Sequence, residues 1–274
     1  MQKLVASFGF DNRLQYYRNS VPLGSPENWN AAVRRAKGHY IKLLHHDDRL
    51  AHADSLRKFV RMLDEHPEAN FAFSASLVES AATTTTRVHC PKEDQLAAIL
   101  SEPAALFMGN VIGAPSATIY RNGLGIEYDR RMKWLVDIDF YIRVLEINPQ
   151  LIYTSEVLVA TTSDANHQIT KACENNAELE LYEHLLLYEK VSGKFRNQTS
   201  SMKVWFRLFE KYRIYKLKDL ENRELRFSPH DNALLENLFD SYQKSRLRRI
   251  PYRVYARLPE SLKRATSYLR KLCP

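Results

Sequence analysis

The fold is decided by residues 28–48, which read NWNAAVRRAKGHYIKLLHHDD. The first half of this stretch predicts a helix that ends at Gly38, because glycine readily adopts the backbone conformation that closes a helix. The short apolar run over residues 40–44 predicts a buried central strand. Asp47 and Asp48 would then lie at the C-terminal end of that strand, where open α/β sheets bind their ligands.

Two adjacent carboxylates at such an edge suit a divalent cation and a phosphorylated substrate. Hard cations prefer oxygen ligands, and they neutralise the charge that develops on phosphate groups. A second interpretation stays open, in which Asp47 and Asp48 cap the next helix, since acidic residues are common at the start of helices.

The rest of the first 170 residues alternates between helical and extended patterns. Apolar residues recur at helical spacing in some segments and alternate with smaller residues in others. We expect helices at residues 54–66, 92–101 and 136–147, and strands at residues 70–79, 116–120 and 151–161. This alternation predicts an α/β sheet with helices on its faces.

Extended patterns stop near residue 175. Helical patterns follow at residues 179–189, 202–218 and 233–243. The sequence therefore predicts two regions, an α/β core over residues 1–170 and a helical, basic region over residues 171–274.

A second candidate site precedes the helix expected at residues 136–147. A turn rich in glycine and proline, residues 109–115, would let the backbone approach a ligand closely. Asp137 and Asp139 then open the helix. Because they are two residues apart they point to different faces, so we expect one to act chemically and the other structurally. Acids in a first turn also stabilise the helix dipole, and that role alone stays open for either residue.

Both stretches resemble the family 2 glycosyltransferases, a large inverting group with the GT-A fold. The first stretch shares the family's spacing of small residues, apolar strand and acids, which here are Asn30-Ala31, Ala36 to Ile41, Leu43-Leu44 and His45 to Asp48. The family commonly has Asp-x-Asp-Asp at the end of this block, so His45 stands in place of its first aspartate.

The second stretch matches the family block that forms the acceptor half of the site. The matching residues are Gly113 to Ser116, Arg121, Tyr128-Asp129 and Val136 to Arg143. In this block Asp137 takes the place of the family's catalytic base, and Val136 replaces the acid that usually precedes it. The two blocks together extend the resemblance over about residues 12–170.

The resemblance implies a GT-A-like, Rossmann-like mixed sheet and a role for each candidate residue. Asp137 would be the catalytic base, and Asp47 would bind a divalent metal, Mn²⁺ or Mg²⁺. His167 could approach the metal or the diphosphate, although a solvated loop histidine is the alternative. The remaining candidates would contact the donor or the acceptor, and they are Asn30, Asp48, Pro115, Ser116 and Asp139.

The same resemblance implies a function. A sugar would move from a nucleotide-sugar donor to a glycan or lipid-linked acceptor with inversion, in the synthesis of a bacterial surface polysaccharide. Family members usually begin with strands ending in Pro-x-Tyr/Phe-Asn and Val-Asp-Asp-Gly-Ser, and neither motif occurs in this sequence. We therefore expect a sheet that is incomplete at its N-terminal side, and a non-catalytic or truncated glycosyltransferase-like module stays open as an alternative.

Composition and charge bound the remaining possibilities. The 274 residues are 45% hydrophobic, enough for a large core, and no apolar run reaches the roughly 20 residues of a membrane span. Three widely spaced cysteines form neither a disulfide framework nor a zinc spacing. We therefore expect a cytoplasmic protein with reduced thiols.

The net charge of +8 is concentrated at the C-terminus. From Ser241 onward, ten basic residues stand against the single acid Glu260. Such a tail could bind an anionic membrane surface, placing the protein at the inner face of the membrane, or it could pack as a basic strap on the α/β body. We expect no nucleic-acid partner, because the charge is confined to the tail and no recognised nucleic-acid motif is present.

Overall fold

The computed structural model describes residues 2–10, 13–165, 171 and 173–248. The strands are β1 (Tyr40–Ile41), β2 (Arg49–Leu50), β3 (Phe71–Ser80), β4 (Thr86–His89), β5 (Thr118–Arg121) and β6 (Leu151–Ser163). The helices up to β6 are α1 (Gln2–Ala6), α2 (Ser25–Arg35), α3 (Ser55–Asp64), α4 (Glu93–Ser101) and α5 (Val136–Ile147), with short 3-10 helices η2 (Pro103–Met108) and η3 (Pro115–Ala117). The elements after β6 are α7 (Ala177–Val191), η4 (Ser192–Lys194), α8 (Gln198–Tyr212), α9 (Leu217–Glu221) and α10 (Pro229–Arg248).

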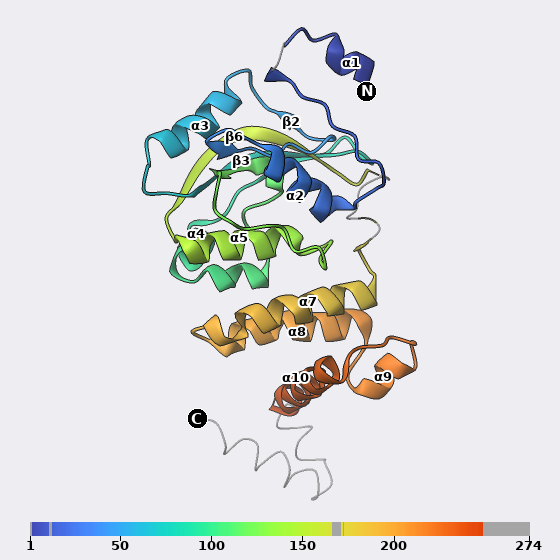
Figure 1. Cartoon of the computed structure of the whole chain (residues 1–274). Helices are drawn as coiled ribbons and strands as arrows, with labels where there is room; N and C mark the ends of the chain where they lie inside the picture. The colour runs from blue at the N-terminus through green and yellow to red at the C-terminus, as the bar shows by residue number, and fades with distance from the viewer. Residues whose placement is uncertain (1, 11–12, 166–170, 172, 249–274) are drawn as a thin grey trace, which may run out of the picture.

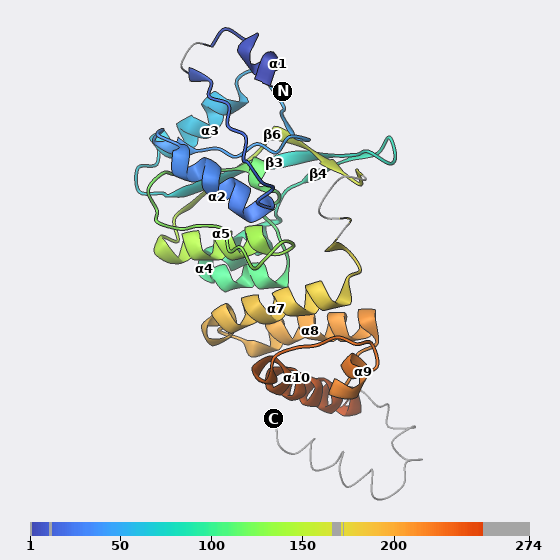
Figure 2. The ribbon, with the colours of Figure 1, turned by 45° about the vertical axis from the view of Figure 1, so that its right-hand side comes forward.

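The strands form one mixed sheet in the order β1-β5-β3-β6-β2, with β4 paired to β3 outside this path. The two long strands β3 and β6 run parallel at the centre, and the other pairs are antiparallel. Figure 1 shows α4 and α5 beside the sheet, then a layer of α7 and α8, and then α9 and α10. The same succession of layers is visible in Figure 2. The expected α/β sheet with a helical C-terminal extension is therefore confirmed.

Side-chain alternation along β3 divides the interior into two cores. Phe71 and Phe73 belong to the larger core, which includes residues of α5, η2, α7 and α8. Ala72 faces the other way and packs in the smaller core with Phe59 and Leu63 of α3. Successive strand residues point to opposite faces, so the sheet is covered on both sides.

The expectation of a central strand at residues 40–44 is wrong. β1 contains Tyr40 and Ile41 alone and lies at the end of the strand order, next to β5. After Ile41 the chain leaves the ladder, and the Lys42 ammonium and the His45 backbone N–H bond to Ser116 instead. The apolar run marks a buried segment correctly, but its position in the sheet depends on pairing with residues far away in the sequence.

Other element boundaries also differ from expectation. The helix expected at residues 202–218 ends at Tyr212, because Arg213 adopts a left-handed conformation with φ of 51°, which closes a helix. The strand expected at residues 116–120 begins two residues later, after the 3-10 turn η3. The short strands β2 and β4 were not predicted, because a few residues carry too little periodic signal.

Two further expectations concern residues that the structure does not describe. His167 and residues 249–274, which form most of the basic tail, lie outside the described residues. Within the described part of the chain, no helix is both long enough and apolar enough to cross a membrane.

Hydrogen bonds from Arg121 of β5 to the end of α3 predict the effect of a substitution on stability. The Arg121 guanidinium donates to the carbonyl oxygens of Leu63 and Ala69 at 2.8 Å and of His66 at 3.2 Å, so it satisfies groups at the end of α3. We expect Arg121→Ala to lower the free energy of unfolding by about 1.5–3 kcal/mol, as for hydrogen bonds from a charged donor. Urea denaturation measures this loss.

The matched control is Arg57→Ala, which removes an exposed arginine from α3 itself. Its effect should stay within about 0.5 kcal/mol, as for most surface substitutions. Equal losses in the two variants would contradict the assigned role of Arg121.

Candidate functional site

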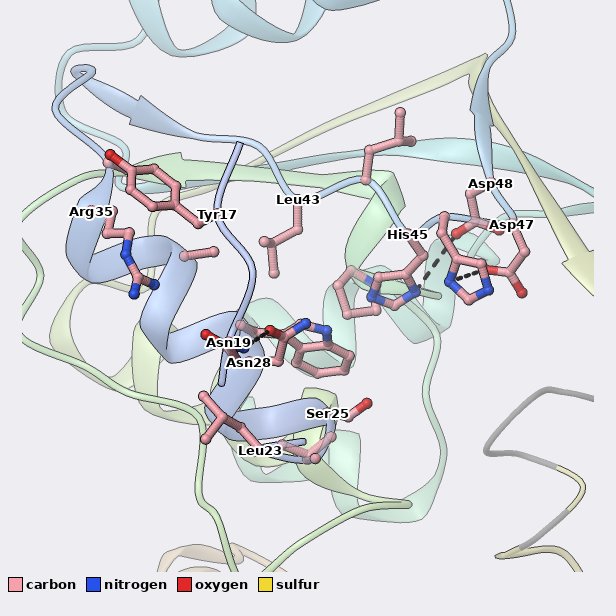
Figure 3. Close-up of a pocket in the computed structure, with 18 of the residues that line it drawn as sticks. Tyr17, Asn19, Leu23, Ser25, Asn28, Arg35, Leu43, His45, Asp47 and Asp48 are labelled. Atoms are coloured by element: carbon pink, nitrogen blue, oxygen red, sulfur yellow. Dashed lines mark hydrogen bonds and ion pairs between the residues drawn. The ribbon is translucent and has the colours of Figure 1, made fainter. Parts of the chain in front are cut away.

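A cavity of about 1370 Å³ brings the two candidate stretches together. One wall is formed by residues 13–24, which run alongside α2, and another by residues 43–48. Other parts of the lining come from α2, from Pro115, from the start of α5 with Asp137, and from the end of β6. Figure 3 shows His45, Asp47 and Asp48 grouped at one side of this space, apart from Tyr17 and Arg35.

Strand β6 holds the loop that carries the two acids. The Thr162 backbone N–H donates to Asp48 Oδ1 at 3.1 Å, and the Thr162 hydroxyl donates to the carbonyl oxygen of Asp47 at 2.5 Å. The Asp48 backbone N–H donates to the His45 carbonyl at 3.1 Å, which closes a tight turn. Potential ligand atoms of His45, Asp47 and Asp48 consequently lie within 4.8 Å of one another, close enough to share one cation.

The imidazole of His45 is the member of this cluster that sequence reasoning did not choose. Its ring stacks on Trp29 with 5.0 Å between centroids, and its Nε2 is buried without a hydrogen-bond partner among the described residues. Burial lowers the pKa of His45, and this effect outweighs the negative charges of Asp48 and Asp47, which raise the pKa. The ring is therefore neutral near pH 7, which is the form that binds metals. The His-x-Asp-Asp spacing was the signal that could have identified it.

Ser116 and Lys42 contact this loop through hydrogen bonds. Ser116 is fully buried, and its hydroxyl accepts from the His45 backbone N–H at 2.9 Å. The Lys42 ammonium donates to the carbonyl oxygens of Leu43, at 3.0 Å, and Ser116. Burial lowers the pKa of Lys42 to about 7, and the nearby charge of Asp48 opposes that shift. Ser116 thus fixes the loop, while its neighbour Pro115 lines the cavity itself.

Asp137 lies in the first turn of α5 and borders the same cavity. The Asn110 amide donates to Asp137 Oδ2 at 2.7 Å, and the Ile138 backbone N–H donates to Oδ1 at 2.9 Å. Burial raises the pKa of Asp137 to about 7, and the negative charge of Glu183 acts in the same direction. A carboxylate with a pKa near the working pH is suited to general-base catalysis.

Asn30 and Asp139 are placed differently from Asp137. The Asn30 side chain is buried and exchanges two hydrogen bonds, of 2.9 and 2.7 Å, with the backbone of Tyr128. Asp139 is also buried and forms ion pairs of 2.6 Å with Arg143 and with Lys190. Neither residue borders the cavity, so in this structure both bind other parts of the protein.

The mixed sheet, the acidic loop held by β6 and the acid at the start of α5 define a GT-A-like protein. Comparison with solved structures supports this class. The chain is similar to residues 1–349 of TarS from S. aureus, with a TM-score of 0.50 and 14% sequence identity over 99% of this chain and 74% of that one. At this identity the likeness establishes the GT-A-like fold.

The N-terminal part of the chain is also similar in sequence to a known family. Residues 1–124 match the model of the family described as glycosyl transferase family 2. This segment contains His45, Asp47 and Asp48 and ends before Asp137. The resemblance found in the sequence is thereby confirmed over this N-terminal segment, which is similar to the family 2 glycosyltransferases. No curated protein matches the chain.

Proposed function

We propose that this protein is an inverting glycosyltransferase that moves a sugar from a nucleotide-sugar donor to a hydroxyl of a glycan or lipid-linked acceptor. The observation that carries the proposal is that one cavity is bordered both by the cluster of His45, Asp47 and Asp48 and by Asp137. A base and a diphosphate-binding group must flank the same sugar if that sugar is to be transferred directly. A role in bacterial surface polysaccharide synthesis is part of the proposal and rests on the family resemblance.

Asp47, Asp48 and His45 are the residues that would hold a divalent cation. Two carboxylates and a neutral imidazole form a ligand set for such an ion, and the Nε2 of His45, which has no hydrogen-bond partner among the described residues, supports this fit independently. When bound, such an ion supplies Lewis-acid stabilisation of the leaving diphosphate. Carboxylates suit Mg²⁺ and Mn²⁺, whereas an imidazole ligand favours transition metals, so Mn²⁺ is the preferred candidate.

Asp137 is the residue that would take the proton from the acceptor hydroxyl as its oxygen attacks the anomeric carbon. The bond to the leaving diphosphate breaks on the opposite face of the sugar, so the configuration inverts. Asn110 holds the carboxylate through Oδ2, and the Ile138 N–H holds Oδ1. These contacts restrict the rotation of the carboxylate, which favours a productive geometry for proton transfer.

The pKa of Asp137 predicts the pH dependence of turnover. The base must be ionised to accept a proton, and burial raises its pKa to about 7. We therefore expect kcat/KM to rise about tenfold per pH unit below pH 7 and to level off above it, as for a single essential base. Initial rates of donor consumption from pH 5 to 9 measure this profile. A midpoint near the ordinary aspartate value would contradict the assignment of a buried base.

A non-catalytic glycosyltransferase-like module is the second candidate. Two substitutions relative to the family pattern favour it, His45 in the acidic block and the buried Val136 before Asp137. The two candidates differ in one measurable property. An enzyme releases nucleoside diphosphate from the donor, whereas a non-catalytic module binds the donor in the presence of Mn²⁺ and returns it unchanged.

A further inference from the structure

We propose that Glu183, on helix α7, is a positioning residue that fixes the first turn of α5 and thereby the orientation of Asp137. The proposal rests on the proposed function, because it assigns Asp137 the role of the base. It makes the helical region after β6 part of the machinery that orients the catalytic group.

The Glu183 carboxylate binds the backbone immediately before α5, a helix that has no side-chain cap of its own. Leu135 occupies the cap position and has no side chain that can accept a hydrogen bond. Glu183 is fully buried, its Oε1 accepts from the Lys133 N–H at 2.7 Å, and its Oε2 accepts from the N–H groups of Trp134 and Leu135 at 2.8 Å. A carboxylate at this place satisfies the N–H of the cap residue Leu135 and the two N–H groups before it, and it complements the helix dipole.

The segment that Glu183 binds leads directly into the helical turn that carries the base. Lys133 and Trp134 border the same cavity as Asp137, which lies only two residues after Leu135. Asn110 holds the Asp137 carboxylate from the neighbouring loop, while Glu183 on α7 holds the backbone that leads into α5. Movement of this turn would therefore displace the base relative to the sugar, and a displacement of about 1 Å can lower a rate about 100-fold.

Glu183 also influences the charge state of the base. Three side chains that interact electrostatically with Asp137 are Glu183 on α7, Tyr141 on α5 and Tyr128 in the preceding loop. Burial raises the pKa of both tyrosines well above the usual value, so both are neutral near pH 7. Burial also raises the pKa of Glu183, but three backbone hydrogen bonds favour its ionised form. Among these three groups, Glu183 is the carboxylic acid, and its ionised form disfavours ionisation of Asp137.

The test is Glu183→Gln, read by the titration of Asp137 itself. The amide removes the charge and turns an NH₂ group toward a backbone N–H. We expect the Asp137 midpoint to move to lower pH, as observed by ¹³C NMR of labelled aspartate carboxyl groups, with the resonance assigned by its loss in Asp137→Asn. We also expect kcat to fall about 10- to 100-fold while the KM for the donor stays nearly constant.

The matched control is Glu180→Gln, one turn earlier on the same helix. Glu180 is buried like Glu183, but its carboxylate pairs with Lys211 of α8 at 2.7 Å. This variant should lose stability and leave the Asp137 midpoint unchanged. If Glu183→Gln does not fold, Glu183→Asp, which keeps the charge on a shorter side chain, should lower kcat with a smaller shift of the midpoint.

An Asp137 midpoint that is unchanged in the Glu183 variant, or that moves equally in the Glu180 variant, would overturn the proposal. The NMR titration needs no turnover. It therefore tests the role of Glu183 even if the wild-type chain transfers no sugar, an outcome that would contradict the proposed function instead.

Discussion

Asp137→Asn is expected to lower donor turnover by about 10²–10⁴-fold, the usual contribution of a general base, while donor affinity stays nearly unchanged. Asparagine has almost the same shape as aspartate, and its carbonyl oxygen can still accept from the Asn110 amide that now binds Asp137 Oδ2. It cannot take a proton at neutral pH. Nucleoside diphosphate release measures turnover, and calorimetric titration with the donor measures binding.

The control for this variant is Asp94→Asn, because Asp94 is an exposed acid in the first turn of another helix, α4. This change should leave turnover unaltered. Turnover retained in Asp137→Asn would place the base elsewhere. A loss of donor binding in that variant would mean that Asp137 serves the architecture of the cavity and not the chemistry.

The second large effect is expected for Asp47→Asn, which replaces a charged ligand of the proposed metal site. We expect Mn²⁺ affinity to fall by more than about 100-fold, since even groups that only orient metal ligands contribute 10- to 100-fold. In the wild type, Mn²⁺ at 100 times its Kd should stabilise the folded protein by about 2.7 kcal/mol through linkage. The shift of the unfolding temperature with added Mn²⁺ measures the stabilisation of the wild type and the loss of Mn²⁺ affinity in the variant.

Asp54→Asn provides the comparison, because Asp54 lies shortly after Asp47 in the sequence and pairs with Lys58 outside the cavity. It should respond to Mn²⁺ as the wild type does. If Asp47→Asn were stabilised by Mn²⁺ to the same extent as the wild type, the cluster of His45, Asp47 and Asp48 would not be the metal site.

Much of the fold could be predicted because its long elements carry a clear periodic signal. The bounds expected for α5, β3 and β6 agree with the structure to within two residues. The strand at Tyr40 was assigned the wrong place in the sheet, because its only described partner, β5, lies about 80 residues further along the chain. The end of α8 depends on the left-handed backbone conformation of Arg213. The sequence around Arg213 contains no glycine or other pattern that predicts this conformation.

For the site, too, the sequence predicts features that depend on neighbouring residues and not those that depend on contacts between distant residues. Acids after a buried strand and at a helix start were recognisable from the sequence, and Asp47, Asp48 and Asp137 do border one cavity. The contacts that occupy Asn30 and Asp139 are made with Tyr128, Arg143 and Lys190, and several of these partners become neighbours only through folding. Glu183 could not be found in the sequence, because its role exists only once α7 packs against the start of α5.

The most direct test of the central claim is calorimetric titration of nucleotide sugars into the wild-type chain, with and without Mn²⁺. A panel of uridine, guanosine, cytidine and thymidine diphosphate sugars covers the common donors. The account predicts that at least one donor binds only in the presence of Mn²⁺, that Asp47→Asn abolishes this binding and that Asp137→Asn retains it. Binding that needs no metal, binding that survives in Asp47→Asn, or no binding of any donor would contradict it.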